Sequence, residues 1–289
     1  MHIRIWGCRG SLAAPGPETV RYGGNTSCVE VRLDSGDLLV LDAGTGIRPL
    51  GAAMDLESVR SLHVLLTHLH LDHLQGLGFF RPLYEPGLDV EVWGPASPVH
   101  GLAERIATYL SPPLFPVRLA DLPAAITFRN APETPVRIGS ATIQASYVTH
   151  QGPTLGYRIE ENGKVLAYIP DHEPSLGVSL QDQPAAWISG HDVARDADLL
   201  LHDAQYGDDE YPEHVGWGHS AMDHVMAFAD KANVDTLLLF HHDPYHTDEE
   251  LDRLLSDALR GRTARAGRTW LASEGMAFEL DDAGFRRSG

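Results

Sequence analysis

Residues 61–77, SLHVLLTHLHLDHLQGL, join a short apolar run to a cluster of polar side chains. The apolar run ends at Thr67, and the next six positions contain three histidines and one aspartate, which are His68, His70, Asp72 and His73. This order predicts a buried strand, a loop and the start of a helix. A divalent metal would satisfy such crowded side chains, because zinc prefers neutral histidine nitrogen and ionised aspartate oxygen. The alternative is a polar surface loop whose histidines share no role.

The composition indicates a soluble globular protein. Of its 289 residues, 43% are hydrophobic and 21% are charged, and the length allows a substantial core. Lys and Arg number 22 against 40 Asp and Glu, a formal net charge of −18. Such a surface repels polyanions, so broad binding of a nucleic-acid backbone is disfavoured, although a local cationic pocket is left open.

The two cysteines and the N-terminus bear on the compartment. Cys8 and Cys28 are too few for a disulfide framework, and we expect both to be reduced and buried. No stretch approaches the roughly 18 apolar residues of a membrane span. The N-terminal MHIRIWGCRG lacks the long apolar core of a signal peptide. We therefore expect a cytoplasmic protein that does not bind membranes.

Alternating helical and extended patterns predict one α/β domain over residues 1–289. Strands are expected at 2–6, 28–33, 38–41, 64–66, 90–93, 126–129, 141–147, 165–169, 199–201 and 237–240, and the second and third of these should form a hairpin. Helices are expected within 95–110 and over 220–231 and 248–260, and the start of one over 74–80. Residues 7–24 are rich in Gly and Pro and should form a long loop near the site.

Several of the later strands share one feature, a His or Asp at the carboxyl end. These residues are His150, Asp171, Asp203 and His241. Strand ends that meet at one edge of a sheet are where α/β proteins build their sites. Asp42 also follows a strand, and it either orients a ligand or caps the next turn.

Taken together, these motifs resemble the metallo-β-lactamase superfamily. THLHLDHLQG matches the family's T-H-x-H-x-D-H-x-x-G, and GCRGS, GGNTSCVEV, LDAGTGI and LFHHDP extend the resemblance over nearly the whole chain. The resemblance implies an αββα sandwich of two mixed sheets with outer helices. It also implies a first metal on His68, His70 and His150. A second metal would be held by Asp72, His73 and His241, with Asp171 bridging both.

The same resemblance bears on which of the later histidines is a ligand. In related phosphodiesterases the ligand lies three residues before the proline of the last motif, which selects His241 over His242. His172, His191, His202 and His246 are expected outside the ligand set. Zinc is the first expectation for both metals, while manganese and iron share these ligands.

Within the superfamily, three features favour phosphodiester hydrolysis. Asp171 stands where many true β-lactamases have a cysteine, HDAQ at 202–205 resembles the ribonuclease Z motif H-E-A-T, and Gly-His-Ser at 218–220 resembles G-H-S-T. By this resemblance a hydroxide between two metals attacks phosphorus, and Asp72 accepts its proton. His219, held by Asp203, would act as the general acid. The alternative for His219 is a residue beside a helix cap, without a chemical role.

The substrate is expected to be a small phosphodiester. Ribonuclease Z grips tRNA with a basic, glycine-rich arm, and no such insertion is seen, so the pattern looks closer to cyclic-nucleotide phosphodiesterases. Residues 111–122 are either a substrate-covering loop or a stiff connector. The alternatives are a lactonase or thioester hydrolase, a tRNA 3′-processing endonuclease and a metal-dependent binding protein without turnover. Homodimerisation is left open.

Overall fold

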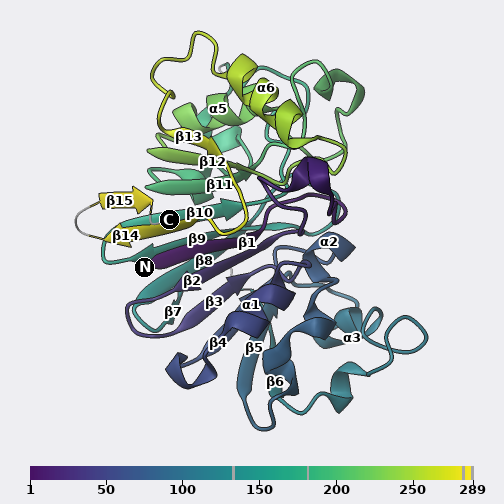
Figure 1. The fold of residues 1–289 in the computed structure, drawn as a ribbon. Helices are drawn as coiled ribbons and strands as arrows, with labels where there is room; N and C mark the ends of the chain where they lie inside the picture. The colour runs from purple at the N-terminus through teal and green to yellow at the C-terminus, as the bar shows by residue number, and fades with distance from the viewer. Residues whose placement is uncertain (132–133, 181, 282–283, 288–289) are drawn as a thin grey trace.

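The computed structural model describes residues 1–131, 134–180, 182–281 and 284–287. Two β-sheets lie face to face with helices on their outer sides (Figure 1). This is the expected αββα sandwich. No helix among the described residues is long and apolar enough to cross a membrane.

The first sheet has eight strands in the described part of the chain. They run β15-β14-β1-β2-β3-β4-β5-β6 across the sheet. Neighbours from β15 to β3 pair antiparallel and those from β3 to β6 pair parallel, so the sheet is mixed. In chain order the strands are β1 (His2–Gly7), β2 (Cys28–Arg32), β3 (Leu38–Leu41), β4 (Leu62–Leu65), β5 (Asp89–Gly94), β6 (Ala125–Asn130), β14 (Ala277–Asp281) and β15 (Gly284–Arg287).

The second sheet has seven strands among the described residues, in the order β13-β12-β11-β10-β9-β8-β7. Those from β7 to β10 pair antiparallel and those from β10 to β13 pair parallel. In chain order they are β7 (Val136–Ile138), β8 (Ala141–Tyr147), β9 (Leu155–Glu161), β10 (Lys164–Ile169), β11 (Leu199–Asp203), β12 (Thr236–Phe240) and β13 (Thr269–Leu271).

Three apolar clusters follow from this layering. One lies between the sheets and unites residues of β1–β3 with residues of β8–β12. The second packs α1 and α3 against the first sheet, and the third packs α4, α5 and α6 against the second. Central strands are therefore buried on both faces, which is why LLVL and LLLF read as continuous apolar runs. The helices are α1 (Ile47–Ala53), α2 (Leu71–Leu74), α3 (Leu102–Ala107), α4 (His191–Ala194), α5 (Met222–Lys231) and α6 (Asp248–Ala258).

The expected strands are all present, with small shifts at their ends, while β7, β9, β13, β14 and β15 were not predicted. The helix placed at residues 74–80 was wrong in position, because α2 begins at Leu71 and ends at Leu74. Its hydrogen-bond ladder ends there, since Gly76 N donates to Ala43 O at 2.9 Å and not to a carbonyl of α2. Cys8 and Cys28 are buried and free, as expected.

Strand direction brings the polar strand ends together. Both β8 and β10 pair antiparallel with β9, so they run in the same direction, and β11 and β12 continue parallel to β10. The end of β4 meets this edge, because Leu155 N donates to Thr67 O at 3.0 Å. Tyr157 OH also donates to Leu66 O across the two sheets, at 2.8 Å. The predicted site residues therefore meet at one edge of the sandwich.

Candidate metal centre

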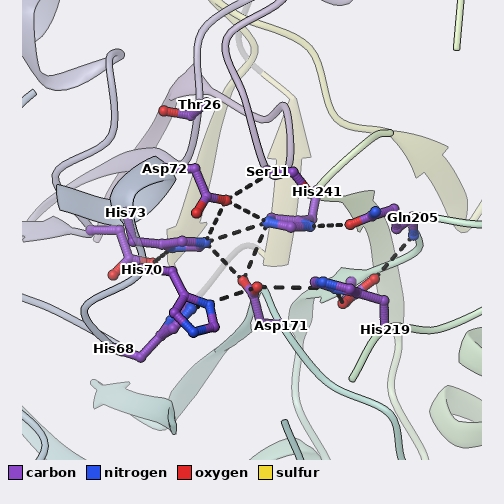
Figure 2. Close-up of polar contacts among 12 residues, drawn as sticks. Ser11, Thr26, His68, His70, Asp72, His73, Asp171, Gln205, His219 and His241 are labelled. Atoms are coloured by element: carbon purple, nitrogen blue, oxygen red, sulfur yellow. Dashed lines mark hydrogen bonds and ion pairs between the residues drawn. The ribbon is translucent and has the colours of Figure 1, made fainter. Parts of the chain in front are cut away.

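All seven residues predicted as metal ligands meet at this edge (Figure 2 shows six of them). Two follow β4, two lie on α2, and one each follows β8, β10 and β12. In that order they are His68, His70, Asp72, His73, His150, Asp171 and His241.

Three histidines form the first group. His68, His70 and His150 present ring nitrogens within 4.8 Å of one another. His150 Nε2 lies 3.3 Å from His70 Nδ1. Asp171 Oδ2 lies 3.8 Å from His68 Nε2 and 3.6 Å from His150 Nε2. One oxygen of Asp171 thus faces this group.

Asp72, His73 and His241 form the second group. Asp72 Oδ2 lies 3.2 Å from His73 Nε2 and 3.1 Å from His241 Nε2. The other oxygen of Asp171, Oδ1, lies 2.9 Å from His73 Nε2 and 3.4 Å from His241 Nε2. Asp171 therefore spans both groups, as the bridging assignment requires.

The far nitrogens of three histidines are held by acceptors. His73 Nδ1 donates to Asp42 Oδ2 at 2.8 Å, and His150 Nδ1 donates to Gly218 O at 2.7 Å. His241 Nδ1 donates to Gln205 Oε1 at 3.0 Å. Each bond engages Nδ1 and leaves Nε2 turned toward the cluster. Asp42 therefore orients a predicted ligand.

The donor set fits divalent metal ions. His68 Nε2 is buried and has no hydrogen-bond partner among the described residues, a state that a bound cation would relieve. Burial lowers the pKa of His68 well below its usual value and also lowers the pKa of His150, so both are neutral. Burial raises the pKa of Asp171, but His241 and the other nearby histidines outweigh it and hold that pKa well below its usual range. Neutral imidazole and ionised carboxylate are the forms that bind metal.

Backbone geometry at the site is specialised. Asp42 and His241 both adopt φ of 60°, a left-handed conformation that non-glycine residues rarely take. Close approaches also restrict two glycines. A Cβ on Gly10 would lie 2.3 Å from His241 Nδ1, and one on Gly218 would lie 2.5 Å from His150 Nδ1. The backbone at Gly10 and Gly218 can therefore pack directly against the Nδ1 side of these two histidines.

His219 and Asp203 form a pair beside the cluster (Figure 2 labels His219). His219 Nδ1 donates to Asp203 Oδ2 at 2.6 Å and lies 4.0 Å from Asp171 Oδ2. Its ring stacks on His241 with centroids 5.0 Å apart. Burial lowers the pKa of His219, but Asp203 outweighs this effect and raises it to about 9. The imidazole is therefore protonated at neutral pH. The proton on Nε2 is the one that Asp203 does not bind.

The remaining histidines lie outside the two groups. His242 turns away from the cluster, and its Nε2 donates to Ala272 O at 2.8 Å. His172 and His202 bond each other at 2.9 Å in the core. His246 contacts Glu210, and His191 contacts the backbone of α5. These side chains therefore bond partners away from the two groups of predicted ligands.

Four contacting residues were not identified from sequence. Ser11 N donates to Asp72 Oδ2 at 2.8 Å, which brings the glycine-rich loop onto the site. Gln205 and Gly218 hold histidines, as described above, and Glu173 bonds the segment that precedes His219. Three of these residues lie inside quoted motifs, namely GCRGS, HDAQ and Gly-His-Ser. Their roles depend on long-range contacts that a motif does not express.

Comparisons with known proteins agree with this geometry. A family model described as "Beta-lactamase superfamily domain" matches residues 38–242. An uncharacterized protein of Mycobacterium tuberculosis is 28% identical over 258 residues, covering 87% of this chain and 84% of its own length. Ribonuclease Z of Myxococcus xanthus is 27% identical over 301 residues, covering 89% and 92%. A solved structure described as a new diphosphatase from the PhnP family superimposes with a TM-score of 0.68 at 18% identity, covering 97% and 98%.

The family model spans well over half of the chain. The chain therefore belongs to the metallo-β-lactamase superfamily. It is a metal-dependent hydrolase, and the superfamily implies divalent metal ions at the cluster described above.

Proposed function

We propose that this protein hydrolyses small phosphodiesters, cyclic nucleotides foremost. The observation that carries the proposal is the 2.6 Å bond between His219 Nδ1 and Asp203 Oδ2, at 4.0 Å from Asp171 Oδ2. A proton donor held at the edge of a metal cluster suits a reaction whose leaving group is a poorly stabilised alkoxide. A thioester, whose thiolate leaving group is stable, opens without comparable need for it.

Two divalent ions are part of the proposal. His68, His70 and His150 would hold one and Asp72, His73 and His241 the other, with Asp171 contributing an oxygen to each. When bound, they would neutralise the phosphodiester charge and activate water. Zinc is proposed because the set is rich in imidazole, and five of the seven side chains are histidines.

The protein side chains would manage the protons. His219 Nδ1 is engaged by Asp203, so Nε2 is the atom that gives its proton to the leaving oxygen. Asp203 also accepts from the backbone of Gln205 at 3.0 Å and of His172 at 3.1 Å, and these bonds fix the carboxylate that orients the ring. Asp72 is proposed to accept the proton of the attacking water at its carboxylate, whose Oδ2 is held by Ser11 N.

Substrate size is argued from charge and from the surface beside the site. The net charge of −18 disfavours a long polyanion. Next to α2 lies a groove of about 540 Å³ lined by Leu69, Leu71 and Leu114 among others, and Leu69 and Leu71 flank His70. Leu114 belongs to the 111–122 segment, so that segment borders the ligand loop. This position supports a role in covering an apolar part of the substrate.

A ribonuclease is the second candidate, favoured by the likeness to ribonuclease Z of Myxococcus xanthus. The test incubates zinc-loaded protein with bis(p-nitrophenyl) phosphate, a panel of cyclic nucleotides, a panel of lactones and a precursor tRNA with a 3′ trailer. We expect turnover of phosphodiesters that is lost on chelation. No phosphodiester turnover by protein with two bound metals would contradict the proposal, and preferred cleavage of the RNA would favour the second candidate.

A further inference from the structure

Glu173 is a fully buried glutamate that belongs to neither ligand group. It lies two residues after Asp171, in the loop that follows β10. A buried carboxylate is strongly destabilising unless hydrogen bonds replace its hydration. The groups that bind it therefore show what this charge does.

Every contact of the Glu173 carboxylate is with a donor. Oε1 accepts from Tyr211 OH at 2.7 Å and from Gly216 N at 2.8 Å. Oε2 accepts from Gly218 N at 2.8 Å and from Gly216 N at 3.1 Å. Gly216 and Gly218 have φ of 86° and 88°, a conformation open to glycine, so the chain can turn both N–H groups toward one carboxylate.

The segment held in this way carries two site contacts. The Gly218 peptide unit donates through its N–H to Glu173 and accepts through its C=O from His150 Nδ1 at 2.7 Å. The next residue is His219. Glu173 N in turn donates to Thr149 O at 2.9 Å, beside His150. Glu173 thus bonds the loop after β8 through its backbone N–H and the segment before His219 through its carboxylate.

We propose that Glu173 is a positioning residue that fixes residues 216–218, so that Gly218 O orients His150 while His219 is held beside Asp203. The inference rests on the proposed metal centre, because His150 is a ligand there. Glu173 would act on the group of His68, His70 and His150 indirectly, because it holds the Gly218 peptide whose carbonyl binds His150. A merely structural role would lower stability and leave zinc binding unchanged.

The test measures zinc affinity by chelator competition in Glu173→Ala, Glu173→Gln and a matched control, Glu161→Ala. Glu161 is also a buried glutamate, and it bonds Asp34 N, Ser140 Oγ and the N-terminal amine at the opposite end of β9 from the site. We expect Glu173→Ala to weaken one of two zinc ions about 10–100-fold, as for other residues that orient metal-bound histidines. Glu161→Ala should lower the melting temperature and leave both zinc affinities as in the unmodified protein.

Both zinc affinities unchanged in Glu173→Ala would overturn the inference. Should that variant not fold, Glu173→Gln decides on the same scale. The amide nitrogen of the glutamine would face an N–H or O–H donor in either orientation of the amide. We therefore expect the affinity for one zinc ion to fall at least about threefold. An unchanged affinity there would equally overturn the inference. Zinc binding without phosphodiester turnover would contradict the proposed function alone, because the Glu173 comparison uses no substrate.

Discussion

The metal centre has a local half and a distributed half. Residues 67–73 supply four predicted ligands from one strand end and one short helix, α2. His150, Asp171 and His241 come from three separate strand ends of the other sheet, and the pair Asp203 and His219 joins them there. The ligands of the local half lie close together along the chain, whereas those of the distributed half meet only because β8, β10 and β12 end at the same edge of the second sheet. Variants in each half test this difference.

The largest effect is expected at Asp171, which spans both groups. Asp171→Ala should reduce phosphodiester turnover at least about 1,000-fold and weaken both metals, because neither group keeps its shared oxygen. Metal content and initial rates measure this. Asp37→Ala, which removes a buried aspartate of the β2–β3 hairpin, is the control and should retain metal. Full metal occupancy in Asp171→Ala would show that both groups bind metal without Asp171, which would contradict this expectation.

His219→Ala should lower turnover about 10²–10⁴-fold on a cyclic nucleotide, the range for loss of a general acid. The loss should be smaller on bis(p-nitrophenyl) phosphate, whose leaving group needs little protonation. Metal content should not change. His63→Ala, at another buried histidine that lies in β4, provides the control for kcat. Equal losses on both substrates would argue against proton donation by His219.

The acceptors behind the histidines allow a direct comparison of the two halves. Asp42→Asn affects His73 in the local half, and Gln205→Leu affects His241 in the distributed half. Each should weaken metal binding about 10–100-fold. Asp42 also holds Thr67 and Tyr168, so Asp42→Asn should lower the melting temperature more. Calorimetry and chelator competition separate the two quantities. A larger drop in melting temperature for Gln205→Leu than for Asp42→Asn would contradict this expectation.

The smallest effect is expected at His242. His242→Gln removes a ring whose Nε2 donates to Ala272 O, so it should lower stability by about 1 kcal/mol, as for a single hydrogen bond. Turnover and zinc affinity should remain within about twofold of the unmodified protein, because the lost bond involves no predicted ligand. His241→Ala is the paired variant and should lose one metal. Loss of metal in His242→Gln instead would exchange the roles of the two residues.

Much of the fold could be read from the sequence. Continuous apolar runs marked the buried strands, and the strand-end positions of His150, Asp171 and His241 marked one edge. The boundary of α2 could not be read, because Gly76 N donates to Ala43 O, a residue distant in sequence, where the helical ladder ends. Strands β7, β9, β13, β14 and β15 were missed, and of these β7 and β13 are only three residues long and carry little pattern.

The sequence by itself determined the superfamily motif and the types of ligand, because four of the seven lie within six consecutive positions and the others each follow a strand. Only the tertiary structure decided which side chains hold them. Asp42 orients His73, Gln205 holds His241, and Glu173 gathers the segment before His219. These partners are 31 to 45 residues apart along the chain. The physical reason is that a hydrogen bond depends on distance in space, which a local sequence pattern does not contain.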